Sequence, residues 1–214
     1  MESDRWEDAR RIEAWAGEVR VNLIRLAAII AFYGHHLLNV YVFHRQDESI
    51  AGSFHTAVTA LIVAWTGSVL ALHYCLSRRW VPPALKFVAV GWDILMITAL
   101  LIILASVAHE PKSWLAVLYL LVIATAPLRL SLPLIWLATL GSMAAYLAYL
   151  GYLKYGLQLP DEARLSRPNQ VIVELALGAA GIIAGQMVRQ ARRLTEGYPV
   201  TVAEPQEPEP CTSK

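Results

Sequence analysis

The chain has 214 residues, of which 57% are hydrophobic and 16% are charged, and its formal net charge is +1. A typical soluble domain is about 45–50% apolar and about 25% charged. The near-zero net charge excludes a basic nucleic-acid-binding domain, which needs lysines and arginines to neutralise phosphates. The hydrophobic excess instead predicts an all-α membrane helical bundle, with the lipid bilayer as its main partner.

Residues 1–21 are predicted to form a cytoplasmic amphipathic helix on the membrane surface. Trp6, Ile12 and Trp15 recur at helical spacing, with charged residues between them. Tryptophans beside arginines suit the headgroup level of a bilayer. A plainer interpretation is a lead-in to the first membrane span, and the two interpretations do not exclude each other.

Residues 22–194 are predicted to form a membrane domain with six transmembrane helices. A spanning helix needs roughly 20 mostly apolar residues. The predicted spans cover about 22–43, 55–76, 86–108, 114–128, 132–153 and 170–188. Pro127 and Pro133 favour a break after the fourth span, because one helix over 114–153 would be about 60 Å long, twice the hydrocarbon thickness.

The orientation follows from the flanking charges. Arginine-rich segments precede the first span, follow the second and follow the sixth, so they lie on one side of the membrane. By the positive-inside rule this side is cytoplasmic, and both termini are predicted to lie there. Residues 195–214 are rich in proline and glutamate and are predicted to form a disordered cytoplasmic tail.

Three ionisable residues lie well inside the predicted spans, where each costs roughly 2.5–3.5 kcal/mol at the centre. Asp93 is about two turns inside the third span, near the expected depth of Arg25 in the first and His73 in the second. An Asp93–Arg25 or Asp93–His73 pair could act as a switch, whereas a static pair that fixes helix packing is the simpler interpretation. Glu174, near the outer end of the sixth span, either reaches headgroup water or belongs to the same polar core.

The first span also carries His35, His36 and Asn39. His35 and Asn39 are four residues apart and share a helix face. They either hydrogen-bond a neighbouring helix, which is the default interpretation, or line a ligand cavity.

The histidines are candidate haem or metal ligands. Two haem-binding histidines must come from different helices at one depth, and the second to sixth spans offer none at the depth of His35 and His36. His55 and His73 lie near opposite ends of the second span, without an obvious partner. No cofactor is therefore predicted. A looser outer metal site has no recognised ligand spacing, so no metal is predicted either. Its residues would be His44, His55 and His109, with Glu110 or Glu174.

The sixth span contains Gly178, Gly181 and Gly185. The last two form a GxxxG pattern, which allows close helix approach either inside the bundle or at a homodimer seam. The chain shows no nucleophile–base pair, Walker loop, HExxH or GxSxG motif, so a non-enzymatic protein is predicted.

Three segments carry a resemblance to a known family. They are FYGHHLLN at 32–39, the hairpin over 113–153 with its LRLSLPLIWLATLG core, and IIAGQMVRQARRL at 182–194. Together they resemble the six-helix membrane sensor domain that precedes catalytic domains in some bacterial serine/threonine kinases, histidine kinases and adenylate cyclases. The hairpin is the most specific of the three. The resemblance implies a multi-pass protein of the bacterial inner membrane.

In that family a basic stalk leads from the last helix to an output domain, and here Arg189, Arg192 and Arg193 correspond to it. Only a short tail follows, so we expect the module to act through a separate protein partner or as a homodimer. The signal would enter at the polar face of the first span or at the outer loops. One alternative is a structural or accessory subunit of a larger membrane complex. Another is a small transporter or redox carrier, with a cavity lined by His35, Asn39 and Asp93.

Overall fold

The computed structural model describes residues 2–42, 48–78, 82, 84–108, 113–158 and 166–196. Within these ranges the chain is all-helical, as the composition predicts. The α-helices are α1 (Glu2–Tyr41), α2 (Glu48–Ser77), α3 (Leu85–Ala108), α4 (Val117–Thr125), α5 (Leu132–Tyr155) and α6 (Arg167–Glu196). Two short 3-10 helices, η1 (Ser113–Ala116) and η2 (Ala126–Arg129), flank α4.

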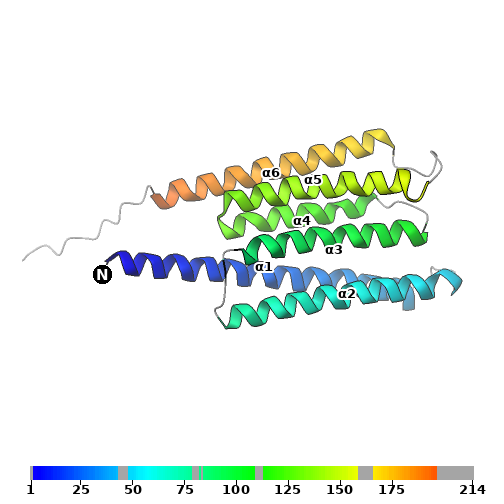
Figure 1. Ribbon diagram of the computed structural model, residues 1–214, viewed down its shortest axis with the longest axis horizontal. Helices are drawn as coiled ribbons and strands as arrows, with labels where there is room; N and C mark the ends of the chain where they lie inside the picture. Colours follow the sequence, from blue (N-terminus) through cyan, green and yellow to red (C-terminus); the bar gives the residue numbers. More distant parts are fainter. Residues whose placement is uncertain are drawn as a thin grey trace, which may run out of the picture.

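The helices run back and forth along a common axis, each antiparallel to the one before (Figure 1). α1 and α2 pack together on one side of the bundle, α5 and α6 on the other, and α3 contacts both α2 and α5. The start of α1 and the end of α6 lie at the same end of the bundle, here called the terminal end. The opposite end is called the distal end.

In the part of the chain that the structure describes, five helices are long and apolar enough to cross a membrane: Trp15–Leu38, Phe54–Ser77, Leu85–Val107, Leu132–Tyr155 and Arg167–Arg193. Their outward faces carry many large apolar side chains, among them Leu23 and Leu175, which are 66% and 68% exposed. Soluble monomers rarely expose extended apolar surfaces. The composition of these faces therefore suits lipid as the surrounding solvent.

The predicted fourth span is shorter than expected. Val117–Arg129 forms an apolar helix shorter than the roughly 20 residues of a full span. Pro127 lies in the tight η2 turn, and Leu130 closes it in the left-handed conformation at φ 48°. A sixth crossing therefore remains a prediction.

The N-terminal segment is continuous with the first predicted span, because α1 passes through positions 21 and 22 without interruption. Trp15 Nε1 donates a hydrogen bond to the carbonyl oxygen of Leu76 at 2.9 Å. A Cβ at Gly17 would lie 2.8 Å from the carbonyl oxygen of Leu128, so α1 touches the η2 backbone there. No proline separates the amphipathic stretch from the first span, and α1 contacts the bundle from Trp15 onward, as the lead-in interpretation expects.

The core is densest around α5, which packs against α3, α4 and α6. Tyr119 of α4 and Tyr146 and Tyr149 of α5 are almost completely buried. Gly141 allows close approach, since a Cβ there would lie 2.9 Å from Cδ1 of Ile94. This core holds α3, α4 and α5 as a scaffold against which the polar face of α1 packs.

Candidate functional site

A stripe of polar side chains follows one face of α1. Trp15, Glu18, Asn22 and Arg25 are spaced by three or four residues, which places them on the same side of a helix. Glu18, Asn22 and Arg25 are only 5%, 3% and 8% exposed. The stripe therefore faces the interior of the bundle, where each polar group needs a partner.

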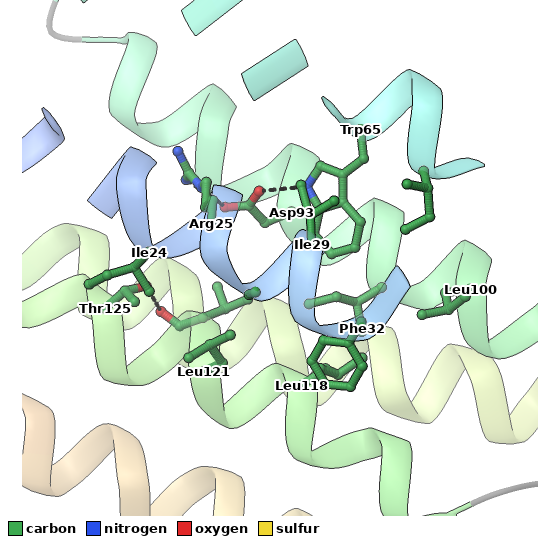
Figure 2. Close-up of a pocket in the computed structure, with 14 residues that line it drawn as sticks. Ile24, Arg25, Ile29, Phe32, Trp65, Asp93, Leu100, Leu118, Leu121 and Thr125 are labelled. Atoms are coloured by element: carbon green, nitrogen blue, oxygen red, sulfur yellow. Dashed lines mark hydrogen bonds and ion pairs between the residues drawn. The ribbon is translucent and has the colours of Figure 1, made fainter. Parts of the chain in front are cut away.

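Arg25 meets Asp93 of α3 at the centre of this face (Figure 2). Its Nε and Nη2 atoms both lie 2.5 Å from Asp93 Oδ2, and Trp65 Nε1 of α2 donates to Oδ1 at 3.2 Å. One carboxylate thus joins α1, α2 and α3. Of the two partners considered for Asp93, Arg25 is the one in contact, while His73 is exposed on α2.

A second ion pair lies nearer the terminal end. Arg129 Nη2 of η2 is 2.8 Å from Glu18 Oε2, and both side chains are less than 10% exposed. Arg129 Nη1 also donates to the carbonyl oxygen of Lys86 at 3.1 Å. Between the two ion pairs, Asn22 Nδ2 donates to the carbonyl oxygen of Val69 at 3.2 Å. We call these contacts, together with Arg25, Trp65 and Asp93, the α1 network.

The Glu18–Arg129 pair was not predicted from the sequence. One signal was available, because Glu18 precedes Arg25 by seven residues and so lies on the same helix face. The tight η2 turn that brings Arg129 to α1 has no such signal.

A small cavity adjoins the ion pair of the α1 network (Figure 2). Its volume is about 50 Å³. A drug-sized ligand occupies a pocket of roughly 300–1,000 Å³, whereas a water molecule needs only about 10–15 Å³. The cavity thus has room for water or a very small ligand beside two buried charges. Apart from Arg25, Trp65 and Asp93, its lining is mostly apolar and comes from α1 to α4, including Ile29, Phe32, Ile97, Leu118 and Thr125.

Nearer the distal end, His36 and His55 contact each other, which corrects the expectation that neither had a partner at its depth. His36 Nε2 lies 3.2 Å from His55 Nδ1, and the two rings stack with centroids 5.4 Å apart. The error arose because α2 begins at Glu48, so His55 is more than a turn inside a helix that runs beside α1. His35 is exposed, and the side chain of Asn39 lies outside the described part of the structure.

The structure describes only part of the outer metal site discussed above. His44, His109 and Glu110 lie outside the described residues. Among the residues that the structure does describe, no group of three or more histidine, cysteine, aspartate or glutamate side chains is placed to hold a metal ion.

Glu174 lies half-buried on α6, and its Oε1 is buried without a hydrogen-bond partner within the described chain. The same is true of Ser142 Oγ and Tyr146 OH on α5, the helix packed against α6. Buried polar atoms of this kind usually bind ordered water. Glu174 therefore contributes at least one inward-facing oxygen to the α5–α6 interface.

The α6 glycines have different surroundings. A Cβ at Gly181 would collide with the side chain of Thr139, whereas a Cβ at Gly178 or Gly185 would meet nothing within 4 Å. One glycine of the GxxxG pattern thus serves packing inside the bundle and the other does not. At the terminal end Arg189, Arg192 and Arg193 are exposed, and Arg192 Nη2 donates to the carbonyl oxygen of Leu130 at 2.7 Å.

Comparisons with known proteins returned nothing: no family model matches the chain, and no curated protein or solved structure matches it. The fold and site define the class of protein by themselves. It is a helical protein whose described residues include five helices suited, by length and composition, to crossing a membrane. Within that class, the α1 network is its most distinctive feature, since it places two ion pairs in the interior of an apolar bundle.

Proposed function

We propose that the chain is a non-catalytic membrane signalling module of the six-helix sensor type, which acts on a partner protein from the cytoplasmic face of a bacterial inner membrane. The observation that carries the proposal is the Asp93 carboxylate, which joins α1, α2 and α3 beside a small cavity. Ionisable groups inside a membrane are costly and commonly serve a function. A buried ion pair is weak support for stability alone, because desolvation offsets much of its attraction.

The α1 network offers a route from the cavity to the end of α6. A movement of α1 relative to α3 changes the Arg25–Asp93 contact and carries Glu18 with it, because both are fixed on one helix. Glu18 holds Arg129 of η2, and the next residue, Leu130, accepts a hydrogen bond from Arg192 of α6. Coupling between sites travels through such contiguous contacts when the elements have two discrete arrangements.

The output surface in this proposal is the basic end of α6, formed by Arg189, Arg192 and Arg193. Its positive charge favours a partner with an acidic surface, since complementary charge steers association. The similarity of the α4–α5 hairpin and of this basic end to the membrane sensor domains supports the same direction of signalling.

The proposal is tested by releasing the full chain from its native membrane in mild detergent and quantifying the co-purifying proteins by mass spectrometry. Replacement of all three arginines, Arg189, Arg192 and Arg193, with glutamine is expected to remove a partner that the wild type retains. Arg167→Gln is the matched control, because Arg167 is exposed at the distal end of the same helix. A set of companions that is the same for wild type and triple variant contradicts the proposed output surface.

Asp93→Asn separates signalling from a purely structural role, since it removes the charge that Arg25 pairs with and leaves the basic end of α6 intact. A signalling module is expected to change its partner occupancy in this variant. An accessory subunit, the alternative function, is expected to keep a fixed stoichiometry with its companions in both the triple variant and Asp93→Asn.

A further inference from the structure

A groove lies between α5 and α6 on the outer surface of the bundle. Its volume is about 210 Å³, smaller than the roughly 300–1,000 Å³ of a pocket for a drug-sized molecule. The lining comes from the first turns of α5 and the last turns of the membrane part of α6. These residues are Leu132, Ile135, Trp136, Gly181, Ile182, Gly185, Gln186 and Arg189.

The groove exists because of a missing side chain. Gly181 brings α6 close to Thr139 of α5, while Gly185, one turn further along, has open space where a Cβ would be. Trp136 and Ile182 contribute exposed apolar surface, at 56% and 65%. The groove is therefore an apolar depression on a face that points away from the core.

The end of the groove has the opposite character. Gln186 and Arg189 lie where α6 approaches the terminal end, seven and four residues before the last residue of the apolar segment Arg167–Arg193. No carboxylate is among the lining residues, and none forms an ion pair with Arg189 in the described part of the chain. Arg192 and Arg193 add positive charge nearby. An apolar groove that ends in positive charge at a membrane boundary complements a phospholipid with an anionic headgroup.

We propose that this α5–α6 groove binds an anionic phospholipid, with one acyl chain along Trp136, Ile182 and Gly185 and the headgroup phosphate at Arg189. Tryptophan at this level suits the lipid interface. A second copy of the chain fits less well, because pairing two copies through this groove would bring their basic α6 ends together, and like charges across an interface are unfavourable. The inference does not depend on the signalling proposal.

The test uses the purified full chain and two synthetic lipids with identical dioleoyl chains, phosphatidylglycerol and phosphatidylcholine. Binding of each is measured by native mass spectrometry over a lipid titration. The wild type is expected to bind phosphatidylglycerol about fivefold more tightly, the effect of one arginine near an anionic lipid. Arg189→Gln is expected to lower this preference, because it weakens binding of the net-negative phosphatidylglycerol more than binding of phosphatidylcholine, whose choline ammonium offsets the charge of its phosphate.

Gly185→Leu is expected to weaken binding of both lipids, because the new side chain fills the groove. The variant should fold, since the position is open and leucine is a better helix former than glycine. Two matched controls lie on the same helix outside the groove: Gly178→Leu, also at an open position, and Arg167→Gln, at the distal end. Both should keep wild-type binding.

Equal binding of the two lipids by the wild type overturns the proposal, as does a loss of binding in Gly178→Leu as large as that in Gly185→Leu. Arg189→Gln decides the question by itself if Gly185→Leu does not fold. Because the readout is lipid binding by the purified chain, a negative result leaves the partner experiment unaffected, and the reverse also holds.

Discussion

Arg25 and Asp93 each place a full charge on a helix that is suited to the membrane interior, and each is less than 10% exposed. Together they are neutral, and Trp65 supplies a further donor to the carboxylate. Loss of one member leaves an uncompensated buried charge, which typically costs about 3–5 kcal/mol, whereas replacing both with apolar residues is often neutral or stabilising.

We therefore expect the effects of single and double substitutions at Arg25 and Asp93 on the free energy of unfolding to be non-additive. Arg25→Met and Asp93→Leu are each expected to lower the free energy of unfolding in detergent micelles by about 3 kcal/mol, and the double variant by less than either single variant. The free energy is measured by denaturant titration with a helical circular dichroism signal. Additive losses would contradict the view that the two charges depend mainly on each other.

For two further pairs of residues, the sequence alone does not identify the partners. Glu18 and Arg129, and His36 and His55, are joined across helices at 2.8 Å and 3.2 Å. The residue types were visible in the sequence, but nothing in their spacing assigned one to the other. The first pair joins α1 to η2, and the second joins α1 to α2 nearer the distal end.

At the scale of helices, close packing depends on a few glycines whose roles differ. A Cβ at Gly181 would meet the Thr139 side chain, so even one methyl group must push α5 and α6 apart. Gly178 lies on the same helix, in open space. The GxxxG pattern alone does not distinguish these positions, because the neighbouring helix determines which glycine it touches.

Gly181→Ala is accordingly expected to destabilise the protein by about 1–3 kcal/mol through overpacking. Gly178→Ala, as control, should leave stability unchanged or raise it by up to about 1 kcal/mol, the difference in helix propensity. Thermal unfolding of the two variants in the same detergent checks this. Equal midpoints for both variants would show that α5 and α6 are not packed closely at Gly181.

The residues that follow α4 explain why it is short. Pro127 removes a backbone donor, and the left-handed Leu130 turns the chain into α5. The turn also positions Arg129 against Glu18 and the Leu130 carbonyl against Arg192. The break between α4 and α5 therefore also links α1 to α6 through η2.

At the scale of the whole molecule, the start of α1 and the end of α6 share one end of the bundle (Figure 1). Arginines gather at this end, where the positive-inside rule places the cytoplasm. The distal end carries Gln158, which is exposed just after α5. The two ends should therefore face opposite compartments.

Cysteine labelling measures this orientation. In a chain with Cys75 and Cys211 replaced by serine, a membrane-impermeant maleimide is expected to label Gln158→Cys in intact cells. Arg20→Cys and Arg193→Cys, at exposed positions nearer the terminal end, should react only after the membrane is opened. Labelling of positions 20 and 193 from different sides would contradict an even number of crossings.

The sequence by itself determined the helical class, the approximate position of each helix and the apolar character of their outer faces, since long apolar runs report locally on length and solvent. It also singled out Arg25 and Asp93 as costly residues at similar depth. Only the tertiary structure decided that Asp93 meets Arg25 and Trp65 while His73 is exposed, and that Arg129 reaches Glu18. The reason is physical: pairing depends on which helices are neighbours and how each is rotated about its axis, and spacing along one helix carries neither.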